Sequence, residues 1–137
     1  MPKIELYEDA LFSYLRERVE GDRFLDLLTA AKAELDEPTN EDGIMKIELN
    51  DTNRPDLWST AGLGRQLRLY QGGTLPTYDF FSKKGEMKDA GERSVSVDPG
   101  LKELRPYIAA FAVSGKAVDE ATLKDLIQTQ EKLCWNY

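Results

Sequence analysis

Alternation of apolar and polar residues predicts two short strands near the N-terminus. Pro2–Leu6 alternates in the first stretch, and Ile47 and Leu49 alternate with Lys46 and Glu48 in the second. A period of two places successive side chains on opposite faces of a strand. We therefore expect each strand to have one face for a core and one for solvent.

Helical spacing of apolar residues predicts two helices between these strands. The first covers Asp9–Val19; Gly21-Asp22 ends it and caps the second, which runs from Arg23 to about Glu34. The acidic stretch 34–42 that follows contains Pro38 and is expected to be a solvated loop. A metal site is the alternative for its carboxylates, which lack the regular spacing of a calcium loop.

A third helix is predicted from Arg54 to Tyr70, with signals at both ends. Asn53 suits the N-cap, Pro55 the first turn, and Asp56 the positive N-terminal end. A glycine pair supplies the stop. Small residues along the middle of its inward face indicate close approach to another element.

Three side chains of this segment are candidates for contacts with a partner or RNA. Trp58 and Arg65 lie on one side and could form a docking surface; alternatively, Trp58 closes the edge of the core. Arg54 could contact RNA phosphate or an acidic partner; alternatively, it pairs with Asp51, Asp56 or a nearby carbonyl. We favour the structural alternative in both cases.

The second half of the chain predicts a linker and the beginning of another domain. A Gly-Gly-Thr-Leu-Pro run at 72–76 is the clearest linker signal, and a hairpin is plausible between residues 78 and 98. A short helical turn is predicted over 101–104. The continuous apolar run Tyr107–Val113 is typical of a strand buried on both faces.

A last helix is predicted after Asp119, which serves as its N-cap. Its apolar side is a stripe with one polar member, formed by Leu123, Leu126, Ile127, Gln130 and Leu133. The pattern runs into aromatic residues without a C-cap. We therefore expect residues 105–137 to be the start of a truncated second domain, with this stripe partly exposed.

Composition and charge narrow the class of protein. The 137 residues are 41% hydrophobic, enough for a core, and carry a net charge of −7. Residues 1–56 hold seven basic and 15 acidic groups, whereas residues 57–137 hold 11 and ten. A free-standing nucleic-acid binder shows a basic footprint, and here the N-terminal part repels phosphate. The N-terminus lacks a signal-peptide pattern and no apolar run reaches membrane-span length, so we expect a cytoplasmic protein.

The residues that usually perform catalysis are missing from the sequence. It contains no histidine and one cysteine, so there is no internal disulfide, no Cys–His zinc set and no histidine base. Gly62-Leu63-Gly64 lies within a predicted helix and is no phosphate loop. We expect this chain alone to have no catalytic residue and to bind no metal or cofactor.

Three blocks in the same order resemble one known family. The strongest is TNRPDLWSTAGLGRQLR at 52–68; the others are the Met-Pro start with Leu35-Asp36-Glu37, and Arg105–Ala110 followed by Gln128–Leu133. They are similar to the N-terminal segment of the phenylalanine–tRNA ligase β subunit, in its archaeal and eukaryotic cytosolic form. Gly64 departs from the pattern, where a stronger helix former such as alanine is expected.

The resemblance implies an α+β fold and a role in protein biosynthesis. It implies a winged-helix-like domain over 1–71, a linker over 72–104 and the first strand and helix of an editing-type domain over 105–137. It further implies an α2β2 assembly that joins phenylalanine to its tRNA with ATP and magnesium, the active site lying in the α subunit. The β subunit would supply tRNA contacts, assembly surface and editing. The alternative is a self-contained winged-helix-like adaptor that binds a protein or nucleic acid through its Trp58/Arg65 face.

Overall fold

The structure is a computed structural model that describes residues 2–51, 53–74, 92–112 and 117–136. The chain divides into two compact units. The first unit combines residues 1–76 with 118–137, and the second covers residues 77–117. The first unit holds a mixed α and β arrangement, which confirms the predicted fold class.

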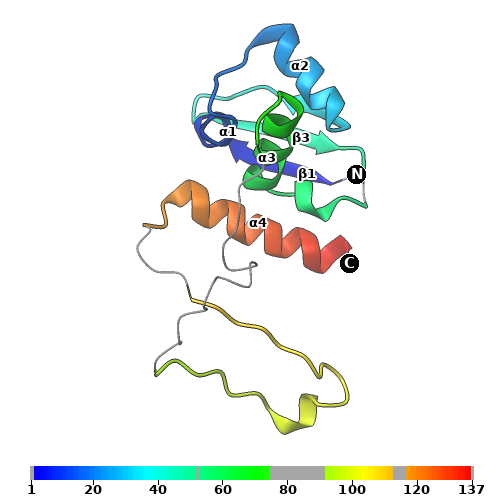
Figure 1. Cartoon of the computed structure of the whole chain (residues 1–137), viewed down its shortest axis with the longest axis vertical. Coiled ribbons are helices and arrows are strands. Elements are labelled where there is room, and N and C mark those ends of the chain that lie inside the picture. The colour runs from blue at the N-terminus through cyan, green and yellow to red at the C-terminus, as the bar shows by residue number, and fades with distance from the viewer. Residues whose placement is uncertain (1, 52, 75–91, 113–116, 137) are drawn as a thin grey trace. The chain divides into compact units, whose positions relative to one another are not determined.

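A three-stranded antiparallel sheet forms the centre of the first unit (Figure 1). Its strands are β1 (Lys3–Tyr7), β2 (Ala33–Glu37) and β3 (Ile44–Leu49), in the spatial order β1-β3-β2. The strands predicted near residues 2–6 and 47–49 are therefore present, and the second of these is the middle strand. β1 lies at one edge of the sheet.

Alternation along the strands gives the sheet one apolar face. Ile4 pairs with Ile47 and Leu6 with Met45 across β1 and β3, and all four side chains are buried. Most of the alternate residues carry charges and point to the other side, namely Lys3, Glu5, Lys46 and Glu48. The apolar face can leave water only if other elements cover it.

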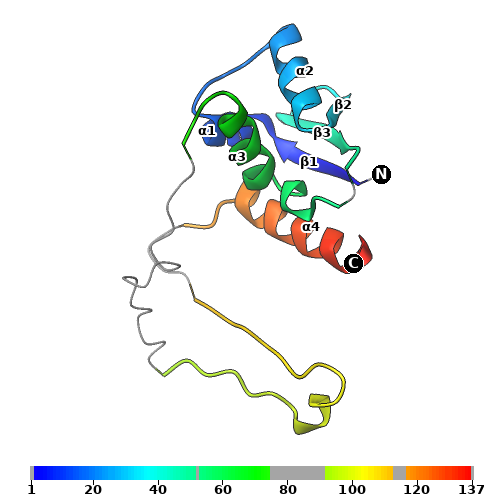
Figure 2. The same cartoon turned by 45° about the vertical axis from the view of Figure 1, so that its right-hand side comes forward.

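Three helices cover this face and complete the core (Figures 1 and 2). They are α1 (Glu8–Leu15), α2 (Gly21–Ala30) and α3 (Thr60–Tyr70). The helices contribute buried side chains at helical spacing: Leu11, Phe12, Leu15, Phe24, Leu27, Leu28, Leu63 and Leu67. Phe12 and Phe24 meet edge to face with ring centroids 5.7 Å apart, a favourable geometry for aromatic pairs.

The first two helices are shorter than the sequence predicted. α1 ends at Leu15 because Arg16 adopts a left-handed conformation, with φ of 62°, and donates its N–H to the carbonyl of Phe12. α2 ends at Ala30, before the left-handed Lys32. The prediction of a solvated loop over 34–42 was wrong at 34–37, where β2 pairs with β3, and is confirmed at 38–42, which are exposed and lie outside the strands.

The third predicted helix is interrupted near its start. A 3₁₀ turn, η1 (Pro55–Leu57), comes first, and α3 begins only at Thr60. Ser59 is the N-cap of α3, and its side-chain oxygen accepts a hydrogen bond from the N–H of Gly62 at 3.0 Å. The prediction that Asn53 caps one continuous helix was therefore wrong.

Two glycines of α3 lie where no side chain fits. A Cβ on Gly62 would lie 1.7 Å from the carbonyl oxygen of Asp56. A Cβ on Gly64 would lie 2.6 Å from the Cβ of Tyr14 in α1. The close approach predicted from the small residues is confirmed. It also explains Gly64, because alanine would collide with α1.

The last helix, α4 (Glu120–Asn136), belongs to the first unit and lies alongside β1 (Figures 1 and 2). Asp119 caps it as predicted, since its carboxylate accepts the N–H of Thr122 at 2.8 Å. The sequence assigned this helix to a second domain over 105–137. The structure groups it instead with the N-terminal part of the chain.

The second unit is described over residues 92–112 only. A turn at Asp98 leads into the 3₁₀ helix η3 (Pro99–Leu101), and the Asp98 carboxylate accepts the N–H of Gly100 at 2.8 Å. Residues 93–98 and 107–112 form no strand and are exposed, so the strands predicted there were wrong over these residues. The first arm of the predicted hairpin lies outside the described residues.

Candidate functional site

Arg54 and Asp56 form an ion pair at the start of η1. The Arg54 guanidinium donates through Nε and Nη2 to both carboxylate oxygens of Asp56, at 2.9 and 2.8 Å, and through Nη2 to Gln66 at 3.2 Å. The hydrogen bond to Asp56 raises the pKa of Arg54. The same bond lowers the pKa of Asp56, against the opposing effect of partial burial. Arg54 therefore pairs with Asp56, as the structural alternative predicted, and these guanidinium donors bond to residues of its own chain.

Trp58 does not offer a docking surface. Its side chain is 1% exposed and belongs to the hydrophobic core. The hypothesis that Trp58 and Arg65 form an exposed contact face was therefore wrong, and Trp58 has the core role that we gave as its alternative. Arg65 is half-buried on α3, and its charge adds to the lowering of the Asp56 pKa.

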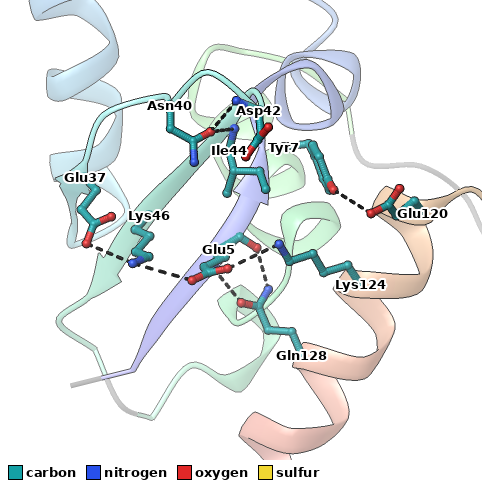
Figure 3. Close-up of polar contacts among 10 residues, drawn as sticks. All are labelled: Glu5, Tyr7, Glu37, Asn40, Asp42, Ile44, Lys46, Glu120, Lys124 and Gln128. Atoms are coloured by element: carbon teal, nitrogen blue, oxygen red, sulfur yellow. Dashed lines mark hydrogen bonds and ion pairs between the residues drawn. The ribbon is translucent and has the colours of Figure 1, made fainter.

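The polar contacts of α4 with β1 and α3 are the most specific arrangement in the first unit. The side-chain amide of Gln128 pairs with the backbone of Glu5, donating to its carbonyl at 2.9 Å and accepting its N–H at 2.6 Å (Figure 3). Asp125 accepts both the N–H and the hydroxyl of Thr60, each at 2.8 Å. The sequence analysis did not single out either α4 residue, because no local pattern marks a polar side chain that binds another element.

Further contacts between α4 and β1 lie around the hydrogen bonds of Gln128 with Glu5. Lys124 lies 3.4 Å from the Glu5 carboxylate, and its ammonium lies 5.5 Å from the centre of the Tyr7 ring. The Tyr7 hydroxyl donates to Glu120 at 3.5 Å (Figure 3). Such exposed contacts each contribute little free energy, but together they align α4 along β1.

The charged face of the sheet and α4 enclose an open groove of about 690 Å³. Its floor carries Lys3 and Lys46, which pair with carboxylates on other strands of the sheet: Asp36, Glu48, Glu37 and Glu5. Hydrogen bonds to Asp36 and to Glu37 raise the pKa of Lys3 and of Lys46, respectively. Because both cations of the floor are already paired with carboxylates, neither offers an unpaired charge to a phosphate group.

The apolar stripe of α4 faces away from the core. Leu123, Leu126, Ile127 and Leu133 are 51%, 58%, 49% and 42% exposed. The expectation of a partly exposed stripe is confirmed. α4 therefore docks through polar side chains and leaves about half of its apolar stripe exposed.

Among the described residues, no three or more Asp, Glu or Cys side chains lie close enough together to hold a metal ion. No helix in the described ranges is both long and apolar enough to cross a membrane.

The fold and the sequence place the chain among the subunits of aminoacyl-tRNA synthetases. Residues 1–73, more than half of the chain, match the family model of the Phe-tRNA synthetase beta subunit B1 domain. The chain belongs to this family, which confirms the resemblance.

Proteins with similar sequences align with this chain along its whole length. The phenylalanine–tRNA ligase beta subunits of Borreliella afzelii (strain PKo) and Borrelia turicatae (strain 91E135) are 44% and 42% identical to it over 138 aligned residues. The chain spans about a quarter of their length. A crystal structure of an N-terminal fragment of the phenylalanyl-tRNA synthetase beta-subunit from Pyrococcus horikoshii matches 98% of this chain and 38% of its own, with 34% identity and a TM-score of 0.77.

Proposed function

We propose that this chain is a structural and interaction part of a phenylalanine–tRNA ligase β subunit and supplies no catalytic group. The observation that carries the proposal is the 44% identity to such a subunit across the full chain. The ligase uses ATP and magnesium to join phenylalanine to its tRNA in the cytoplasm. Its partners are an α subunit, in an α2β2 assembly, and tRNA.

The chemistry of the described residues supports a role in assembly. Carboxylates that act as general acids or bases need burial or a like charge to raise their pKa. Asp56, the acid whose pKa is most clearly perturbed, is shifted downwards by Arg54 and is held as an ion-paired carboxylate. We therefore assign ATP, magnesium and the reacting groups to other parts of the ligase.

A segment exchange in a relative tests this proposal. In the Borreliella ligase, the matching segment of the β subunit is replaced by this chain in one variant and deleted in another. We expect the exchange to preserve the αβ assembly in size-exclusion chromatography and to keep phenylalanine-dependent ATP–pyrophosphate exchange within about tenfold. The deletion should weaken the αβ assembly. The α and β subunits that still assemble should retain phenylalanine activation.

Two results would contradict the proposal. One is an assembled deletion variant in which phenylalanine activation is abolished, because the segment would then carry a reacting group. The other is aminoacylation of tRNA by the 137-residue chain alone. Binding of this chain to transcript tRNA, measured across salt concentrations, gives the number of phosphates that it contacts.

A further inference from the structure

We propose that the B1 domain carries a helix-recognition site, formed by the outer edge of β1 and the N-terminus of α3. The site recognises an aspartate and a glutamine three residues apart on one helix. In this structure α4 occupies it through Asp125 and Gln128. The proposal is independent of the ligase function, because every contact lies within this chain.

The edge of β1 supplies the first half of the site. The Pro2 carbonyl accepts the N–H of Leu49, and the N–H of Glu8 donates to the carbonyl of Gly43. The even positions of this edge therefore face β3, and the odd positions between them turn their N–H and C=O outward. Glu5 is the middle one of these. The primary amide of Gln128 offers one donor and one acceptor, and it pairs with Glu5 as a residue of a fourth strand would (Figure 3).

This pairing answers a general problem of sheet edges. Unpaired N–H and C=O groups on an edge strand attract other strands, and natural proteins cover them. Here the cover is a side chain of a helix. Only glutamine or asparagine can both donate to the carbonyl and accept from the N–H of one residue through an amide.

The N-terminus of α3 supplies the second half of the site. The first N–H groups of a helix have no partner within the helix, and Thr60 is the first residue of α3. The Ser59 hydroxyl oxygen accepts a hydrogen bond from the N–H of Gly62. The Asp125 carboxylate accepts hydrogen bonds from the N–H and the hydroxyl of Thr60. With α4 docked, Thr60 is 4% exposed. A negative charge is also favoured at this end of a helix.

The two contacts together determine the orientation of α4. Residues three apart lie on the same side of a helix, so Asp125 and Gln128 reach both halves of the site at once. The buried hydrophobic residues of the described chain all lie between Ile4 and Leu67, and none comes from α4. Polar complementarity, and not burial of its apolar stripe, therefore selects the face with which α4 docks.

Hydrogen exchange measured by NMR on the whole chain tests the site. The reporters are the amides of Glu5 and Thr60, and the internal reference is Leu6, whose N–H points to β3. Gln128→Ala is compared with Gln130→Ala, which makes the same change in the same helix on its exposed side. Asp125→Ala tests the other contact.

We expect Gln128→Ala and Asp125→Ala each to accelerate exchange at both Glu5 and Thr60 by about tenfold or more, because one docked helix protects both amides. Leu6 should be unchanged in both variants, and Gln130→Ala should alter none of the three. Equal exchange at Glu5 in the Gln128→Ala and Gln130→Ala variants would overturn the proposal. The proposal would also be overturned if Gln128→Ala accelerated exchange at Glu5 alone and Asp125→Ala accelerated exchange at Thr60 alone.

A second variant keeps the test decisive if Gln128→Ala lowers the stability of the whole unit, which faster exchange at Leu6 would reveal. Gln128→Met has nearly the same shape but can neither accept the Glu5 N–H nor donate to the Glu5 carbonyl. It should accelerate exchange at Glu5 while Leu6 remains protected. Unchanged exchange at Glu5 in this variant would also overturn the proposal, whatever the ligase assays show.

Discussion

Helices α3 and α4 are both amphipathic, yet they dock in opposite ways. α3 turns its apolar and small residues to the core, where Leu63 and Leu67 are fully buried. α4 turns polar side chains to the same unit and leaves residues such as Leu126 more than half exposed. Periodicity thus identifies the stripe of a helix, but the partner available to each face decides which face docks.

The strongest test of this contrast is the same substitution in both helices. Leu67→Ala removes a side chain that is 0% exposed, so we expect the free energy of unfolding to fall by about 2–5 kcal/mol. Leu126→Ala should change it by no more than about 0.5 kcal/mol, since that side chain is 58% exposed. Urea unfolding of the two variants measures both values. Similar losses would show that the stripe of α4 is buried in solution.

A smaller effect is expected where α3 packs most closely. In an exposed helix, replacing glycine by alanine is favourable by about 1 kcal/mol. Gly62→Ala should have the opposite sign and cost about 1–3 kcal/mol, because the new methyl group would lie 1.7 Å from the Asp56 carbonyl oxygen. Thermal unfolding gives the sign. A stabilised Gly62→Ala variant would show that η1 and α3 are not packed as described.

The smallest effect concerns the ion pair beside α3. Arg54 depresses the pKa of Asp56 below its ordinary value of 3.8, so the folded state binds this proton less readily than the unfolded state. The stabilisation is therefore present above about pH 4 and is lost as the pH falls through the lower, folded pKa. Both side chains are about two-fifths exposed, so Asp56→Asn should cost about 0–1 kcal/mol at pH 7. The difference from wild type should shrink in acid unfolding as the pH falls through the folded pKa of Asp56, and a constant difference would contradict the assignment.

Local sequence patterns were sufficient to predict the elements whose apolar residues follow a single period from end to end. The strands near Ile4 and Ile47 alternate regularly, and α4 follows a capping aspartate with a regular stripe. The small residues on the inward face of α3, such as Gly64, also indicated close packing before any partner was known. In each case the signal lies within a few residues of the element that it predicts.

The missed features depend on contacts between distant residues. β2 contains only Ala33 and Leu35 as apolar positions, too few to distinguish a strand from the end of a helix, and its pairing with β3 decides the outcome. The interruption at Ser59 was hidden by Pro55 and Asp56, which are also good helix-start residues. Docking of α4 required Glu5 and Gln128 to meet across more than a hundred positions of sequence.

The location of the buried hydrophobic residues, all before residue 68 in the described chain, has a practical consequence. Residues 1–74 can be produced separately from a peptide of residues 117–136 without dividing the hydrophobic interior. Calorimetry on the two pieces would then report the affinity of a helix for its own domain as an ordinary bimolecular constant. An intramolecular contact would become a binding reaction with a measurable stoichiometry, enthalpy and heat capacity.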